Sequence, residues 1–296
     1  MSFLGVLRYN LHNEILWCLP KKVTHSYLYK KSFGKKLDLE NPKNFNEKLQ
    51  YLIVNKYGIK EGRLADKYLV KEYVENLRIE GLNVAKTLKI YNNANDIDLS
   101  ELPKKFVLKC NHGSGNVFVC TDKEKFDFEN AKKVLNSSLK QCFAKHTFEY
   151  HYKYIKPVIM AEEYLDDNTG KNPLDYKFYV FNGKCDRMLL CSERDKSLRL
   201  DDFDLEWKKI DDTLPKYKSQ KDIEKPKNFE NMVRIAEELC IKDGKVDIPF
   251  ARVDLYDLNG KIYFGEYTFT PACGLIDYYN EKTLMELGEK LDLSKY

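Results

Sequence analysis

The spacing of apolar residues changes repeatedly between two periods along the chain, and this change predicts an α+β protein. Apolar side chains recur every three to four residues, as in amphipathic helices, in residues 2–18, 46–57, 64–77, 126–148, 230–241 and 280–292. Runs rich in β-branched and aromatic residues predict strands and hairpins in residues 84–91, 105–119, 157–165, 175–190 and 251–271. The polar stretch 195–228 predicts a loop.

The last of these hairpins organises the rest of the chain. Two strand-like runs flank Asn259-Gly260, and both residues tolerate the positive φ of a tight type I′ turn. Folding at this turn is expected to bring Asp254 and Glu266 level on one face. Opposed carboxylates repel, so such a pair usually holds a cation, and oxygen ligands favour Mg²⁺ or Mn²⁺. A solvent-exposed acidic hairpin explains the pair equally well.

A glycine-containing stretch from Lys105 to Val119 predicts strand, loop and strand, with Lys109 at the end of the first strand. Gly113 and Gly115 would let the backbone approach a ligand closely, and exposed N–H groups there can cradle phosphate oxygens. The stretch matches neither a Walker loop nor a dinucleotide-binding fingerprint. A glycine hairpin with an incidental lysine is the alternative interpretation.

Two further strands carry candidate nucleotide contacts. The run 157–165 is apolar until it reaches Glu162 and Glu163, so its backbone could read a base and an acid could accept from a ribose hydroxyl. The run 175–184 alternates and ends in a second Asn-Gly turn, which predicts a hairpin with Lys177 on one face.

Composition excludes several classes of protein. Fifty Lys and Arg against 46 Asp and Glu give a net charge of +4, too balanced to indicate nucleic-acid binding. No apolar run is long enough to span a membrane. The eight cysteines contain no Cys-x-x-Cys pair and the five histidines no metal-binding spacing, so reduced thiols in the cytoplasm are expected.

One segment, residues 17–36, mixes lysines with aromatic residues. Such a mixture could hold an anionic membrane surface or a polyanionic chain, which would place a cytoplasmic protein at the inner face of the membrane. A solvated face of amphipathic side chains is the more common explanation.

Five motifs in order resemble the ATP-grasp superfamily: a lysine at a strand end, a glycine loop, an apolar strand into Glu-Glu, Asp-x-Lys, and Arg-x-Asp followed by Glu-x-x-x-x-Pro. Longer matches resemble its TupA-like branch, which is associated with teichuronopeptide and capsular polysaccharide synthesis and is often labelled glycosyltransferase. These matches are Asn41-Pro-Lys-Asn-Phe-Asn-Glu-Lys-Leu49, Ala65-Asp-Lys-Tyr68, Val107-Leu-Lys-Cys-Asn-His-Gly-Ser-Gly115 and Asp175-Tyr-Lys-Phe178. The resemblance covers the chain from about residue 30 onward.

The resemblance implies an ATP-grasp fold, in which two α+β lobes clasp ATP after a helical N-terminal segment. The expected boundaries are 1–60 for that segment, 61–158 for the first lobe with the glycine loop, and 159–296 for the second lobe with the metal-binding hairpin. The implied ATP-binding residues are Lys109, Gly113, Ser114, Gly115, Glu162, Glu163, Tyr164, Leu165, Asp175 and Lys177. The implied Mg²⁺ ligands are Asp254, Glu266 and Thr268.

Two departures from the family pattern matter. Thr268 stands where asparagine is common, and a hydroxyl is the weaker metal ligand. The front of the chain reads as helices and not as the parallel α/β domain that often precedes this fold, so the usual substrate-binding domain is expected to be reduced or replaced.

The implied chemistry is ATP-dependent ligation of a carboxylate to an amine through an acyl phosphate. Arg252 lies two residues from Asp254, so alternation turns both onto one face, where Arg252 and Lys177 would be catalytic. Neutralising Asp254 is an equally good reason for Arg252. The expected substrates are a sugar acid or acidic glycan precursor and an amine. An ATP-grasp kinase acting on a sugar or amine, or a glycosyltransferase, are the alternatives.

Overall fold

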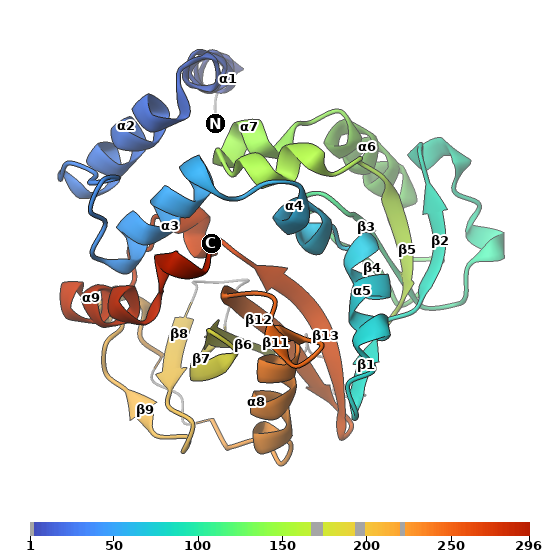
Figure 1. Ribbon diagram of the computed structural model, residues 1–296. Coiled ribbons are helices and arrows are strands. Elements are labelled where there is room, and N and C mark those ends of the chain that lie inside the picture. Colours follow the sequence, from blue (N-terminus) through green and yellow to red (C-terminus); the bar gives the residue numbers. More distant parts are fainter. Residues whose placement is uncertain (1–2, 167–173, 193–198, 220–222) are drawn as a thin grey trace.

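The computed structural model describes residues 3–166, 174–192, 199–219 and 223–296, and mixes helices and sheets as the sequence predicts (Figure 1). Within these residues the helices are α1 (Phe3–Cys18), α2 (Lys21–Phe33), α3 (Phe45–Asn55), α4 (Ile59–Ala65), α5 (Leu69–Leu77), α6 (Phe128–Leu139), α7 (Phe143–Thr147), α8 (Phe229–Glu238) and α9 (Glu281–Lys290). The strands are β1 (Leu82–Val84), β2 (Thr87–Tyr91), β3 (Phe106–Cys110), β4 (Phe118–Cys120), β5 (Ile159–Glu163), β6 (Asp175–Phe181), β7 (Lys184–Ser192), β8 (Arg199–Phe203), β9 (Lys209–Ile210), β10 (Ile241–Lys242), β11 (Lys245–Val246), β12 (Phe250–Leu258) and β13 (Lys261–Thr268).

Two sheets carry the architecture. In the described residues one has seven strands in the order β1-β13-β12-β6-β7-β8-β9, and the other has four in the order β2-β5-β3-β4. Figure 1 shows the smaller sheet beside the larger one, with α4 and α5 between them. The sheets divide the chain differently from the expected boundaries, because β5 completes the smaller sheet while β1 joins the larger one. The three-part division stays a prediction.

The predicted helix over residues 64–77 is two helices, α4 and α5. The carboxylate of Asp66 accepts hydrogen bonds from the backbone N–H groups of Tyr68 (2.8 Å) and Leu69 (3.2 Å), so it caps α5. A capping side chain interrupts a helix because its own backbone leaves the helical conformation. The apolar spacing continues across this break and conceals it.

The predicted loop over residues 195–228 was wrong, because β8 and β9 lie inside it. β8 pairs antiparallel with β7 and β9 with β8. The sequence hides these strands because β8 buries two acids, Asp201 and Asp202. Asp201 pairs with Lys209 at 2.5 Å and Asp202 with Arg187 at 3.3 Å. Both acids are buried and paired with cations, so their charge does not mark a solvated loop.

The β12–β13 hairpin forms at Asn259-Gly260, and Asp254 faces Glu266 as expected. Four residues separate Asp254 from the turn and five separate the turn from Glu266, so uninterrupted pairing would place Asp254 opposite Gly265. A bulge between Asp254 and Leu255 corrects the register. Gly265 is required there, because a Cβ would lie 2.8 Å from the Asp254 carbonyl oxygen.

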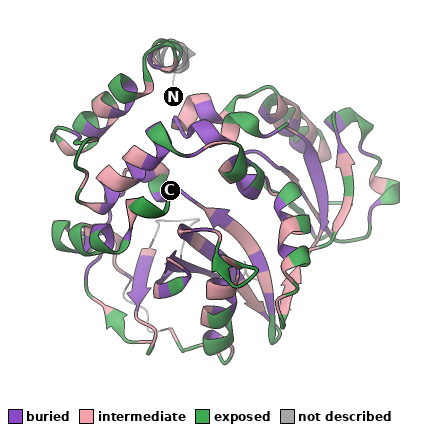
Figure 2. Cartoon of the chain, viewed as in Figure 1, coloured by how far each residue is buried: buried purple, intermediate pink, exposed green. Residues whose placement is uncertain are grey.

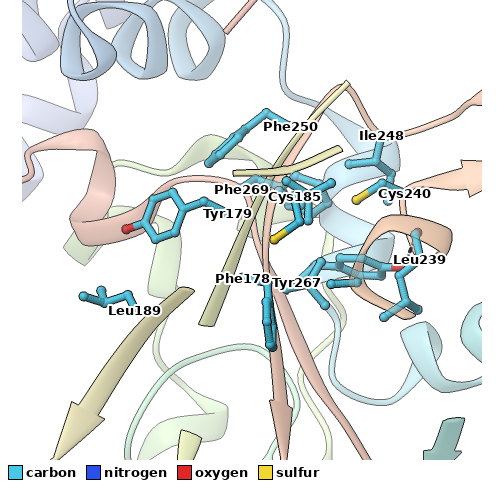
Figure 3. Packing of buried hydrophobic residues seen from close by; sticks show 14 of the residues in the cluster. Phe178, Tyr179, Cys185, Leu189, Leu239, Cys240, Ile248, Phe250, Tyr267 and Phe269 are labelled. Carbon is cyan, nitrogen blue, oxygen red and sulfur yellow. Dashed lines mark hydrogen bonds between the residues drawn. The ribbon is translucent and has the colours of Figure 1, made fainter. Parts of the chain in front are cut away.

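The larger sheet is sandwiched between helices. Every residue of β6 is buried (Figure 2), and successive side chains point to opposite faces. Phe178 meets Phe229 of α8, with ring centroids 6.0 Å apart, while Tyr179 meets Phe45 of α3 at 6.3 Å. Figure 3 shows Phe178 and Tyr179 pointing apart within this core. Among the described residues, no helix has both the length and the apolar character needed to cross a bilayer.

The contact between α9 and the start of α3 gives a stability prediction. A Cβ on Gly288 would lie 2.3 Å from the Lys43 carbonyl oxygen, so Gly288→Ala must push the two elements apart. We expect it to lower the free energy of unfolding by about 1–3 kcal/mol, measured by urea denaturation. Glu289→Ala, on the exposed side of the same helix, is the control and should have almost no effect. Equal stability of the two variants would contradict the packing described.

Candidate active site

The centre of the candidate site is a buried carboxylate held by two cations. Sheet register places Lys177 directly opposite Asp254 across β6 and β12. Asp254 is only 1% exposed, and the Lys177 ammonium donates to its Oδ2 and, at 2.6 Å, to Asp175. Arg252 donates from Nε and Nη2 to the two Asp254 oxygens, both at 2.7 Å. Burial raises the pKa of Asp254, and the two cations Arg252 and Lys177 oppose that rise.

Glu266 and Thr268 extend this cluster onto β13. Arg252 Nη2 donates to the Thr268 hydroxyl at 2.9 Å and lies 3.9 Å from Glu266 Oε1. Lys67 reaches Glu266 Oε2 at 2.9 Å. Desolvation by the surrounding protein would raise the pKa of Glu266. The three cations Lys67, Lys177 and Arg252 outweigh it and hold that pKa well below its usual range.

The smaller sheet holds a second acid between two lysines. Glu162 of β5 is buried, and its two oxygens lie 2.5 Å from the Lys71 and Lys109 ammonium nitrogens. Burial would raise the pKa of Glu162, but the two lysines outweigh it and lower that pKa. Lys71 is held further by the Ala85 carbonyl at 2.6 Å. The predicted phosphate lysines Lys109 and Lys177 therefore stand on different sheets, each on a buried acid.

The glycine loop lies between β3 and β4. Gly115 has φ +77°, which favours glycine, and a Cβ on Gly113 would lie 3.1 Å from the Phe143 ring. Ser114 is exposed. Glycine avoids backbone strain at position 115, and at position 113 it packs closely against the Phe143 ring.

The segment after β5, expected to meet adenine, is held in place by Lys86. The Glu163 N–H donates to the Lys86 carbonyl at 3.0 Å, and the Glu163 side chain accepts from the Lys86 N–H at 2.7 Å. Tyr164 faces Lys105, whose ammonium lies 5.7 Å from the ring centroid, and Leu165 is partly buried. These two hydrogen bonds fix the backbone where β5 ends.

A corner between α4 and α5 joins the two sheets. Asp66 accepts from the Asn111 side chain at 3.0 Å, and the Lys67 N–H donates to the Asn111 carbonyl at 3.1 Å. Asn111 follows β3 and precedes the glycine loop, while the Lys67 side chain reaches Glu266 on β13. One dipeptide thus fixes the glycine loop relative to the acidic hairpin.

Sequence reasoning missed three charged residues of this region: Lys67, Lys71 and Glu149. The motif Ala65-Asp-Lys-Tyr68 contained Lys67, but no role was assigned to it. Glu149 is 5% exposed and accepts from the hydroxyl of Thr270, two residues beyond Thr268. Burial raises the pKa of Glu149 to about 7. No local signal identifies it, because its neighbours come from distant parts of the chain.

Asp254, Glu266 and Thr268 offer only oxygen atoms, which are the ligands that a hard divalent cation takes, and all three lie around the Arg252 guanidinium. No group of three His, Cys, Asp or Glu with metal-binding geometry occurs among the described residues. Protein cations currently compensate the acids, so a metal ion would share or replace those contacts. A hollow of about 360 Å³ beside α5 and β10 lies elsewhere and contains none of the predicted site residues.

Comparison with known proteins gives one family match and several weak structural likenesses. The family model described as TupA-like ATPgrasp matches residues 47–292. No protein of curated function matches the chain significantly.

Three solved structures illustrate the likeness. D-alanine–D-alanine ligase from Bacillus anthracis, complexed with ATP, shares 18% identity and a TM-score of 0.44 over 83% of this chain and 69% of that one. N5-carboxyaminoimidazole synthetase from Staphylococcus aureus shares 14% identity and a TM-score of 0.40 over 69% of this chain and 44% of that one. ATP-grasp ligase PsnB, complexed with a minimal precursor, shares 12% identity and a TM-score of 0.41 over 78% of this chain and 60% of that one. The chain thus spans less than two thirds of the last two.

Glu149 predicts a specific pH dependence of stability. Its folded-state pKa of about 7 lies above the ordinary 4.5, so between these values the folded protein holds a proton that the unfolded chain has lost. The free energy of unfolding should therefore fall as pH rises through this interval. Glu149→Gln should remove that fall, gaining about 2–3 kcal/mol relative to the parent between pH 5 and pH 8 in urea denaturation. Exposed Glu124→Gln is the control, and parallel curves for Glu149→Gln and the parent would contradict the assignment.

Proposed function

The chain belongs to the TupA-like ATPgrasp family, so its two-sheet α+β architecture is the ATP-grasp fold, and we propose that it is an ATP-dependent carboxylate–amine ligase. One observation carries the proposal: Lys177 and Arg252 converge on Asp254, in one row with Glu266 and beside Thr268. A cluster of cations and oxygens of this kind suits a transferring phosphoryl group.

ATP would be held between the two sheets. Lys109 from the smaller sheet and Lys177 from the larger one would contact phosphate oxygens, and the loop Gly113-Ser114-Gly115 would present backbone N–H groups to them. The segment from Glu162 to Leu165 would face adenine, and Asp175 would orient Lys177, to which it is already bonded. Such contacts position the nucleotide without covalent chemistry.

Asp254, Glu266 and Thr268 would hold Mg²⁺, with Mn²⁺ as the alternative. When bound, the ion would neutralise charge on the transferring phosphoryl group. Thr268 offers a neutral hydroxyl that already accepts from Arg252, which makes it the weakest of the three ligands.

The reaction would proceed in two steps. A carboxylate oxygen of the acid substrate bonds to the γ-phosphorus as the bond to ADP breaks. The amine then bonds to the acyl carbon, inorganic phosphate leaves, and the nitrogen loses a proton. Arg252 would stabilise the oxyanion of the tetrahedral intermediate in the second step.

The substrate class follows from the family resemblance: a sugar acid or acidic glycan precursor, joined to an amine in the cytoplasm during surface-polysaccharide synthesis. A kinase acting on a sugar or an amine is the second candidate, because the same cations would serve phosphoryl transfer alone. A glycosyltransferase fits less well. The Asp202-Phe-Asp204 pattern that could bind its metal has Asp202 fully buried against Arg187.

A nucleotide panel tests the ATP site. ATP with Mg²⁺ at saturation should raise the melting temperature by about 5 °C, whereas UDP-sugars should not. Lys109→Ala should weaken ATP binding about tenfold and leave adenosine binding unchanged, because only a phosphate contact is lost. Glu162 keeps Lys71 in this variant, so the fold should survive. Lys89→Ala, an exposed lysine of β2 paired with Glu101, is the control. Stabilisation by a UDP-sugar instead would overturn the proposal.

Arg252 separates a ligase from a kinase. Once a carboxylic acid that triggers ADP release is found, Arg252→Met should slow amide formation roughly a hundredfold, the scale of one lost oxyanion donor. Acyl-phosphate formation, trapped as a hydroxamate with hydroxylamine, should suffer less. A stable phosphorylated product without hydroxamate would instead establish the kinase.

A further inference from the structure

Charge is distributed unevenly along this chain. Residues 1–37 contain seven Lys and Arg but only one acid, Glu14, and so carry a net charge of +6. Because the whole chain carries +4, residues 38–296 carry −2. The basic part includes α1 and α2, which lie at the periphery of the molecule, away from both sheets (Figure 1).

The inward sides of α1 and α2 are anchored to the rest of the protein. Leu16 and Tyr29 are buried, and the Trp17 ring lies 5.1 Å from that of Tyr150. His25 bonds to the Gln50 side chain in α3, and Lys145 of α7 donates to Glu14 at 2.8 Å. The two helices are thus docked, and the exposure of their other side is a property of the folded protein.

The outward side carries apolar residues at every fourth position. Leu11, Ile15, Leu19, Val23 and Tyr27 are 62%, 56%, 38%, 50% and 41% exposed. Leu11 and Ile15 therefore share one side of α1, and Val23 and Tyr27 share one side of α2, while Leu19 lies between the two helices. A ring contact of 5.7 Å between His12 of α1 and Tyr27 of α2 joins the two helices. We call this set of five residues the apolar strip.

Lysines accompany the apolar strip on α2. Lys22, Lys30 and Lys31 are all exposed, and the Lys31 ammonium lies 5.9 Å from the centroid of the Tyr27 ring. The surface therefore combines aliphatic side chains with a concentrated positive charge.

We propose that the apolar strip and its lysines dock the protein onto an anionic lipid bilayer. Apolar side chains of an interfacial helix enter the boundary between headgroups and acyl chains, while lysines meet anionic headgroups. A second copy of the chain is a poorer partner, because a symmetric contact would bring two lysine-rich surfaces together. A polyanionic glycan would satisfy the lysines but leave the aliphatic side chains in water. The inference is independent of the proposed ligase activity.

Vesicle flotation of the full chain tests this surface. The protein should float with vesicles of equal phosphatidylglycerol and phosphatidylcholine, and stay behind with phosphatidylcholine alone. The triple variant K22Q/K30Q/K31Q should bind about 100-fold more weakly, at roughly fivefold per lysine. The triple variant I15S/L19S/V23S should bind these vesicles at least tenfold more weakly, because the apolar strip no longer enters the bilayer.

Matched controls separate the surface from general charge and hydrophobicity. K125Q/K184Q/K282Q removes the same charge from lysines whose side chains are 85%, 81% and 86% exposed elsewhere. I59S/V246S/M285S removes exposed apolar residues elsewhere. Both should bind like the parent, and circular dichroism should show that every variant is folded.

Four results would overturn the proposal. The first is failure of the parent to bind anionic vesicles, and the second is equal loss in the matched controls. The third is retention on an immobilised anionic polysaccharide that survives I15S/L19S/V23S, which would assign the surface to a polymer. Dimerisation in sedimentation equilibrium that this variant abolishes would assign it to a second copy. An unchanged thermal shift with ATP in all variants keeps this test separate from that of the ligase.

Discussion

A buried carboxylate in the larger sheet is the constraint on which the rest of the site depends. Asp254 is 1% exposed, and an uncompensated charge at that depth would cost several kcal/mol. Lys177 and Arg252 compensate it from two adjacent strands, so the pairing of β6 with β12 and the charge pattern require each other. The residues that would act on a nucleotide are therefore also those that make this part of the sheet stable.

The position of the site relative to the second sheet depends on the corner at Asp66 and Lys67. Its hydrogen bonds to Asn111 hold the end of β3, and the Lys67 side chain holds Glu266. This corner thereby fixes the position of the charged cluster on one sheet relative to the charged cluster on the other. The same residues therefore compensate buried charge and hold the two sheets in place.

Much of this arrangement follows from patterns in the sequence. Turn chemistry at Asn259-Gly260 was enough to place the hairpin, and simple alternation was enough to place Arg252 and Asp254 on one face. Asp254 lies opposite Glu266 only because a bulge shifts the register. The bulge at Gly265 was not foreseeable, because it arises from a close approach between two backbones. Propensity could not reveal the capping role of Asp66, since the apolar spacing continues past it.

The buried acids of β8 show a different limit. Asp201 and Asp202 look like loop residues until their partners Lys209 and Arg187 are known, and pairing is a tertiary property. Glu149 and Lys67 escaped notice for the same reason. Sequence periodicity reports which face a side chain takes, but it does not report which charges meet there.

Two lysines contact Glu162, and this lowers the free-energy cost when one of them turns to a ligand. Lys109 and Lys71 both contact this acid, and Lys71 is fixed independently by the Ala85 carbonyl. If Lys109 turns away to a negatively charged ligand, Glu162 keeps one positive neighbour and no bare charge is left in the interior. The second lysine thus lowers the reorganisation free energy of the exchange. The first lysine is free to change partners because the second one stays.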